Sequence, residues 1–110
     1  MQVLFTARDA ESEQMRDVAV RRVRFVMRRL AWLTPRASVQ LADVNGPRGG
    51  VDKRCQVQFT TDGGATVVIT SMARDWRNAL DSALVRANRA LVRLCQRSRA
   101  QRMRADRAVA

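Results

Sequence analysis

The sequence predicts an α/β protein of the two-layer α+β kind, with the element order β-α-β-β-β-α. Its 110 residues are enough for one domain with a single core. Four short segments alternate apolar and polar residues, as strands do, and two long segments repeat apolar residues every three or four positions, as helices do. Because each strand offers one apolar face, we expect a four-stranded mixed sheet with two helices packed on one face.

The first half of the chain predicts a strand, a helix and a second strand. Residues 2–7 alternate and form the first strand. From about 12 to 32 the apolar residues follow helical spacing, and both Asp9 and Ser12 are suited to cap this helix. Residues 36–44 alternate again, which predicts the second strand.

The second half predicts a hairpin followed by a long helix. Strands are expected at about 53–61 and 65–72, and the turn Asp62-Gly63-Gly64 joins them, because its residues tolerate positive φ. Asp75 is suited to cap a helix that runs from about 76 to at least 98.

The end of the chain is basic and carries no apolar stripe. We therefore expect the last helix to fray after residue 98. This divides the chain into a folded domain over 1–98 and a basic C-terminal tail over 99–110.

The few aromatic residues are expected to serve packing. Phe5, Phe59 and Trp76 fit core positions, and Phe25 and Trp32 are expected in the core or at a helix edge. With no row of surface aromatics to stack on bases, recognition should depend on backbone charge and shape.

The charge of the chain indicates a polyanionic partner. Twenty-one basic residues face ten acidic ones, for a net charge of +11 and a pI near 11.7. Such an excess causes self-repulsion in the folded state unless a polyanion is nearby. All the basic residues but Lys53 are arginine, whose guanidinium group suits phosphate and bases, although a GC-rich genome would also favour arginine over lysine.

Four arginines of the last helix form a row of a single sign, which we call the arginine row: Arg86, Arg89, Arg93 and Arg97. Their spacing of three and four places them on one stripe, where like charges destabilise an isolated helix. An ordinary solvated face is the alternative, but the unrelieved repulsion favours an RNA-binding role. Further expected RNA contacts are Arg21, Arg24, Arg28, Lys53 and Arg54. If the two helices lie side by side, the arginines of the first helix face the arginine row across a groove.

Several classes of function find no support in the sequence. There is no histidine, no phosphate-binding or nucleophile motif and no CxxC, so we expect no enzyme activity, cofactor, metal or small-molecule substrate. Cys55 and Cys95 are expected to be buried, reduced thiols. No signal peptide and no apolar run of about 20 residues is present, which favours a cytoplasmic protein without a membrane partner.

Two segments resemble one protein family. The stretch 43–55 (Asp-Val-Asn-Gly-Pro-Arg-Gly-Gly-Val-Asp-Lys-Arg-Cys) resembles the loop and third-strand entry in the ribosome hibernation promoting factor family, also called ribosome-associated inhibitor or sigma-54 modulation protein. The stretch 75–81 resembles that family's Asp-hydrophobe-Tyr-Ala-Ala-Ile-Asp signature, with Arg77 in place of the tyrosine and Asn78 in place of an alanine. The resemblance covers roughly 2–98 and includes the order of elements.

The resemblance implies a partner and a mode of action. A member of this family binds ribosomal RNA of the small ribosomal subunit in the channel that holds messenger RNA and transfer RNA anticodon ends, and so keeps ribosomes idle. The arginine row stands where the family usually has basic residues. Long members carry a C-terminal dimerising domain. The length of this sequence matches the short members, so no dimerisation is expected from an intrinsic domain.

Other functions remain open on sequence grounds. A general double-stranded RNA-binding protein or RNA chaperone would share the basic surface, and the old family name suggests a protein–protein regulator of a transcription factor. Membrane binding by the last helix is disfavoured, because its apolar stripe is needed to cover the sheet.

Overall fold

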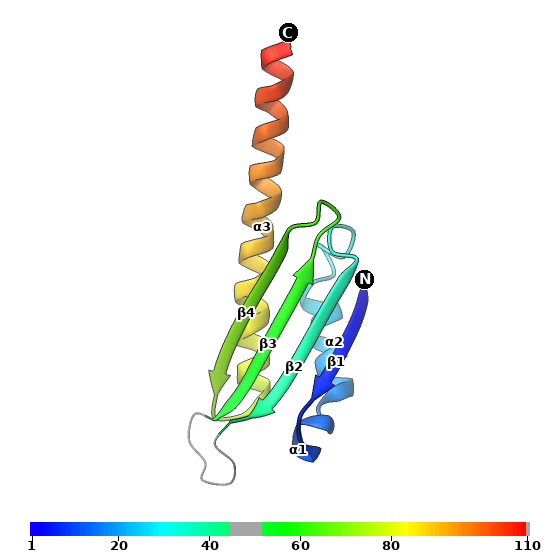
Figure 1. Cartoon of the computed structure of the whole chain (residues 1–110), viewed down its shortest axis with the longest axis vertical. Helices are drawn as coiled ribbons and strands as arrows, with labels where there is room; N and C mark the ends of the chain where they lie inside the picture. Colours follow the sequence, from blue (N-terminus) through cyan, green and yellow to red (C-terminus); the bar gives the residue numbers. More distant parts are fainter. Residues whose placement is uncertain (45–51, 110) are drawn as a thin grey trace.

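The computed structural model describes residues 1–44 and 52–109, and the Gly-rich loop that the sequence places at 46–50 lies outside them. The elements follow the predicted order, with the first helix in two parts (Figure 1). Their bounds are β1 Gln2–Ala7, α1 Ala10–Glu13, α2 Arg16–Val26, β2 Arg36–Asp43, β3 Lys53–Thr60, β4 Thr66–Ala73 and α3 Trp76–Val109.

The four strands form one mixed sheet, as predicted. Their spatial order is β1-β2-β3-β4, with β1 parallel to β2 and the other neighbours antiparallel. Phe5, Val39, Val57 and Ile69 lie opposite one another in register and form a row across all four strands. The hairpin between β3 and β4 contains Gly64 at φ 87°, a conformation that favours glycine.

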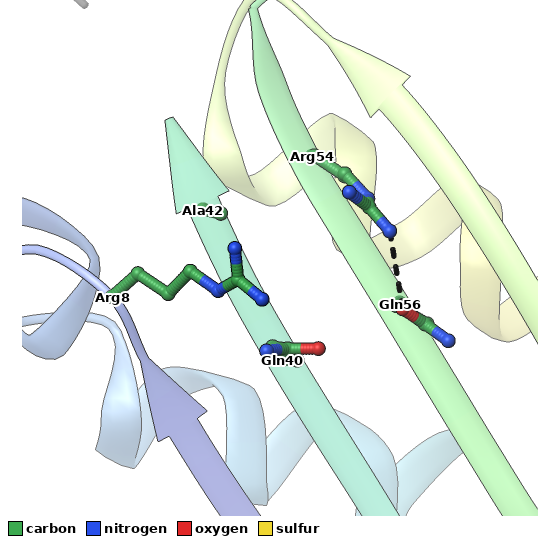
Figure 2. Close-up of a pocket in the computed structure, with 5 residues that line it drawn as sticks. All are labelled: Arg8, Gln40, Ala42, Arg54 and Gln56. Atoms are coloured by element: carbon green, nitrogen blue, oxygen red, sulfur yellow. Dashed lines mark hydrogen bonds between the residues drawn. The ribbon is translucent and has the colours of Figure 1, made fainter. Parts of the chain in front are cut away.

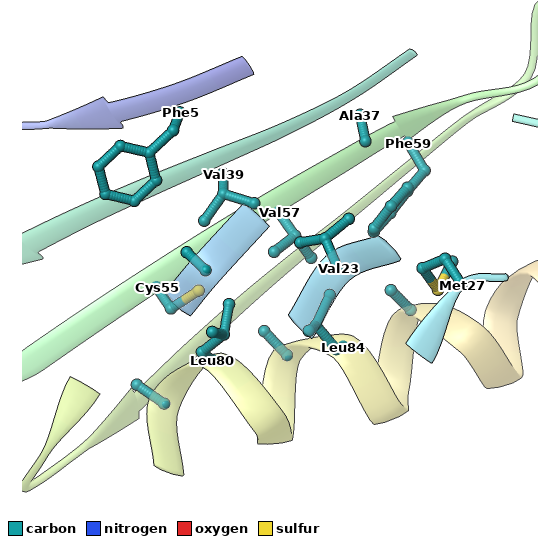
Figure 3. Packing of buried hydrophobic residues seen from close by; sticks show 14 of the residues in the cluster. Phe5, Val23, Met27, Ala37, Val39, Cys55, Val57, Phe59, Leu80 and Leu84 are labelled. Atoms are coloured by element: carbon teal, nitrogen blue, oxygen red, sulfur yellow. The ribbon is translucent and has the colours of Figure 1, made fainter. Parts of the chain in front are cut away.

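The core lies between the sheet and the helices, which all cover the same face (Figures 1 and 3). Phe59 and Leu84 are fully buried there, and Val23 and Met27 reach the same cluster from the α2 side. The prediction that the helices share one face of the sheet is therefore confirmed. The other face carries no helix, and we call it the open face.

The sequence predicts one helix from about 12 to 32, but the structure divides this segment into two helices and a series of turns. Asp9 caps the short α1 by accepting a hydrogen bond from the Ser12 backbone N–H (2.8 Å), and a turn separates α1 from α2. Beyond Val26 the chain forms tight turns closed by bonds such as Leu30 N–H to Met27 O (2.9 Å). These turns bury apolar residues three apart, the same spacing that a helix would show.

The Asp9 cap makes a pH-dependent contribution to stability. Burial acts to raise the pKa of Asp9, but hydrogen bonds from the backbone N–H groups of Ser12 and Asp43 outweigh it and hold the pKa below its ordinary 3.8. The contribution is therefore present above that ordinary value and is lost as pH falls through the folded-state pKa.

Asp9→Ala should lower the free energy of unfolding at neutral pH by about 1 kcal/mol, because a backbone donor loses its cap. Urea unfolding of both proteins at neutral pH and at pH values below 3.8 measures the difference, which should shrink with acidity. A difference that stays constant over that range would contradict a role for the ionised carboxylate.

The last helix extends beyond its predicted end. The sequence predicted fraying after 98, whereas α3 continues to Val109 and projects past the sheet (Figure 1). The extension contains no glycine or proline and is rich in alanine and arginine, which are strong helix formers. The missing apolar stripe thus marks where α3 leaves the sheet. In the part of the chain that the structure describes, no helix is long and apolar enough to cross a bilayer.

The two cysteines are free thiols in different surroundings. Cys55 is fully buried, and burial raises its pKa to about 12 from an ordinary 9.0, whereas Cys95 is half-buried. The prediction of buried thiols is confirmed for Cys55 and only in part for Cys95.

A thiol reagent should modify Cys95 in the native protein and leave Cys55 intact. At the raised pKa the thiolate fraction of Cys55 is about a thousandfold lower than at the ordinary value. Mass spectrometry after iodoacetamide treatment identifies the labelled peptide, and labelling in guanidinium chloride provides the control in which both cysteines react. Equal labelling in native buffer would contradict the burial of Cys55.

Candidate nucleic-acid interface

The start and the packing of α3 determine where the arginine row points. Asp75 accepts a hydrogen bond from the Asn78 backbone N–H (2.8 Å) and caps the helix as predicted. From there an apolar stripe that includes Leu80, Leu84 and Leu91 packs fully buried on the sheet. At 3.6 residues per turn the row spans a sector of about 80° beside this stripe. Its four members are all exposed: Arg86, Arg89, Arg93 and Arg97.

The arginine row follows the free edge of the sheet. Arg86 Nη1 donates a hydrogen bond to the Thr70 carbonyl oxygen of β4 (3.1 Å), and β4 is an edge strand. Arg93 and Arg97 line a shallow groove whose other wall is the beginning of β4 at Thr66. The row and the β4 edge therefore form one continuous cationic border.

In the part of the chain that the structure describes, no carboxylate neutralises this border. Among the residues that the structure describes, none of the row is in a salt bridge. The nearest acidic residue of α3, Asp81, pairs instead with Arg22 of α2 (3.0 Å). The like charges of the row stay exposed and unrelieved, which is the arrangement expected of a phosphate-binding surface.

The predicted groove between the two sets of helix arginines does not form. α2 meets α3 through the Arg22–Asp81 salt bridge and through the Asn88 side-chain amide, which donates to the Val26 carbonyl oxygen (3.2 Å). Asp81 and Asn88 lie about 140–160° around α3 from Arg86. The row therefore points away from α2, because the sequence alone does not say which flank of α3 the shorter helix covers.

Arg21 and Arg24 of α2 and Arg28, which follows α2, lie on a second surface instead. Arg21 is exposed, Arg24 Nη1 donates to the Met1 carbonyl oxygen (3.4 Å), and Arg28 donates to the Phe25 carbonyl oxygen (2.7 Å). All three side chains are exposed and accessible to a ligand.

The expectation that Phe25 and Trp32 pack in the core or at a helix edge is wrong. Their exposed fractions are 58% and 64%, and the Arg28 guanidinium lies 4.4 Å from the centre of the Phe25 ring. Helical spacing does indicate that Phe25 is exposed, because Phe25 follows the buried Val23 by two positions and so lies on the opposite side of the helix.

Lys53 lies in an acidic cage rather than at a basic surface. Its Nζ is 2.7 Å from Asp43 Oδ2, 3.7 Å from Glu11 Oε2 and 3.9 Å from Asp52 Oδ2, and it lies over the Trp76 ring. The hydrogen bond to Asp43 raises the pKa of Lys53 above its ordinary 10.5; burial opposes this, and the surrounding negative charges add to it. Lys53 therefore serves the fold, although the sequence grouped it with the RNA contacts.

Arg54 lies on the open face, one residue further along β3. Its Nη2 donates to the Gln56 side-chain oxygen (3.3 Å). Arg8, at the end of β1, lines the same hollow. Sequence reasoning did not single out Arg8, because it stands outside both the helix stripe and the strand pattern.

Acidic residues gather at one end of the molecule. Asp9, Glu11, Asp43, Asp52 and Asp75 lie where α1 is located and where α3 begins, whereas α3 carries its arginines toward the opposite end (Figure 1). The acidic cluster and the arginine row therefore lie toward different ends of the molecule.

Two solved structures share this architecture. A ribosomal subunit interface protein from Coxiella burnetii superposes with a TM-score of 0.71 at 11% sequence identity, covering 87% of this chain and 99% of that chain. The N-terminal domain of Protein Y from Thermus thermophilus superposes with a TM-score of 0.64 at 19% sequence identity, covering 86% of this chain and 97% of that chain. The chain has the fold of these two proteins. No family model and no curated protein matches it in sequence.

Proposed function

We propose that the protein is a ribosome-associated translation inhibitor of the hibernation factor family, acting in the cytoplasm without bond chemistry. It binds ribosomal RNA of the small subunit in the messenger and transfer RNA channel and excludes both ligands from it. The observation that carries the proposal is the unpaired arginine row along the β4 edge. A fold shared with a ribosomal subunit interface protein supports the choice of partner.

The physical basis of binding is the release of counterions from RNA phosphates. Guanidinium groups without carboxylate partners are free to displace the ions that RNA condenses around itself. Arg86, Arg89, Arg93 and Arg97 form the primary contact surface, and the secondary one consists of Arg21 and Arg24 of α2 with Arg28 just after it. Lys53 is not part of either, because its charge is neutralised within the cage.

Binding to the small subunit should therefore depend steeply on salt. If about six phosphates are neutralised, the logarithm of the affinity should fall with the logarithm of salt concentration with a slope of roughly −4 to −5. Sedimentation of the purified protein with small subunits over a series of salt concentrations measures this slope. A slope near zero would contradict an electrostatic interface.

Competition experiments separate the proposal from a general RNA-binding function. A ribosome-specific factor should stay on the small subunit in the presence of an excess of bulk duplex RNA. Displacement by duplex RNA at equal affinity would instead identify a general double-stranded RNA binder. A protein partner that survives nuclease and high salt in a pull-down would identify a protein–protein regulator.

A further inference from the structure

The open face of the sheet has a charge pattern that the proposed interface does not explain. Outward residues of all four strands alternate with the core residues, and they are glutamine, threonine, serine, a few apolar residues and arginine. Two of them are cationic, namely Arg36 and Arg54, Arg8 directly follows β1, and no carboxylate stands at an outward position of these strands. An uncovered sheet face of one sign is complementary to an anionic ligand.

A hollow on this face brings two of the arginines together. It is lined by Arg8, Gln40, Ala42, Arg54 and Gln56 (Figure 2). The register explains its shape, because Ala42 on β2 faces Arg54 on β3, and the Arg8 N–H bonds to Leu41 O (3.3 Å), which places Arg8 beside Ala42. A small residue thus lies between two long cationic ones.

The spacing suits one shared anion. Arg8 and Arg54 are separated by two strand spacings, which amount to about 10 Å between their backbones. Figure 2 shows the Arg8 side chain reaching toward β2 and the Arg54 side chain lying along β3 toward Gln56. Because both arginines line the hollow, both guanidinium groups can donate to one anion that binds there.

The described contacts leave donors of the hollow available to a ligand. Arg54 uses one donor on the Gln56 side chain, and within the described residues Arg8 has no side-chain partner. Two like charges that line one hollow repel one another, and no described carboxylate lines the site to relieve them. The Gln40 and Gln56 amides add donors beside the guanidinium groups.

We propose that Arg8, Arg54, Gln40 and Gln56 form a phosphate-binding site over Ala42, and that it holds a backbone phosphate of RNA. The choice of RNA as the source of the phosphate rests on the proposed function, whereas the anion site rests on the sheet geometry alone. This site lies on the open face and the arginine row lies along α3 and the β4 edge. The domain therefore contacts RNA on two sides and bridges two stretches of backbone.

Three variants separate this site from general charge. Arg8→Gln/Arg54→Gln removes both cations, and Ala42→Leu fills the hollow at unchanged charge. Arg36→Gln/Arg74→Gln is the matched control, because it removes two exposed arginines that do not line the hollow. Binding of a 5′-labelled single-stranded RNA is followed by fluorescence anisotropy, with circular dichroism to verify folding.

The first variant should weaken RNA binding by about tenfold relative to the control, because charge-assisted hydrogen bonds are lost. Its salt slope should also decrease by about one. Ala42→Leu should weaken binding in the same direction while the control stays close to wild type. Equal affinities of the Arg8/Arg54 variant and the control would overturn the site.

Nuclear magnetic resonance then identifies the ligand and separates this site from the arginine row. The side-chain N–H signals of Arg8 and Arg54 should shift on addition of the RNA, and they should do so equally in a protein whose arginine row is reversed to glutamate. Inorganic phosphate alone should shift them only at far higher concentration. Shifts by phosphate at the concentration of the RNA would overturn RNA as the source, and no shift with either would overturn the site. Neither result depends on whether the protein sediments with ribosomes.

Discussion

Reversing the arginine row by the quadruple change R86E/R89E/R93E/R97E should abolish binding to the small ribosomal subunit without unfolding the protein. All four side chains are exposed, so their replacement leaves the buried stripe of α3 intact. The loss combines four missing phosphate contacts with four new repulsions. We expect the affinity to fall by more than about a hundredfold. The magnitude of the salt slope should decrease by about three to four. Sedimentation with purified small subunits measures both.

The matched control carries the same change in net charge elsewhere. Reversal of Arg16, Arg36, Arg74 and Arg77 also replaces four exposed arginines, and within the described residues their one salt bridge is the solvent-exposed pair of Arg16 with Glu13. It should weaken binding far less than reversal of the row. Equal losses in the two quadruple variants would mean that net charge alone holds the protein on RNA, and the assigned surface would be wrong.

Phe59→Ala should cause the largest loss of stability of any single truncation in the sheet. Phe59 is fully buried in the cluster between β3 and the helices (Figure 3). Removing a buried phenyl ring costs about 3–5 kcal/mol, because the cavity left behind collapses only in part. That is a large share of the roughly 5–15 kcal/mol by which a domain is stable. Guanidinium unfolding curves measure the change.

Phe25→Ala is the natural control, because it removes the same ring from an exposed position. Its cost should stay within about 1 kcal/mol, the contribution of an exposed cation–π contact with Arg28. A loss for Phe25→Ala as large as that for Phe59→Ala would show that the two rings are equally buried, contrary to the fold.

The order of elements was predictable because alternating and helical spacings record which side of each element is buried. Val39, Leu41, Cys55, Val57 and Phe59 all follow the two-residue period, and all are buried on one face of the sheet. The end of α3 was not predictable in this way, since apolar spacing reports contact with the sheet and not helix formation. The break after Val26 was also hidden, because tight turns and helices share a spacing of three.

The candidate site was predictable only within single elements. The arginine row could be identified because its members lie on one helix, where spacing alone determines their common face. Its position beside β4 was not predictable, because it depends on which side of α3 packs against α2. The Arg22–Asp81 and Asn88 contacts of the structure show that side. The Arg8–Arg54 hollow was not predictable, because it depends on the register of β1, β2 and β3. That register places Arg8 beside Ala42 and near Arg54, which are 34 and 46 positions further along the chain.

An electron cryo-microscopy map of the protein on the small ribosomal subunit would test the account most directly. The account predicts density for the domain in the messenger and transfer RNA channel, with the guanidinium groups of Arg86, Arg89, Arg93 and Arg97 within hydrogen-bond distance of ribosomal RNA phosphates. A map in which the domain binds elsewhere, or in which the arginine row faces solvent, would contradict it.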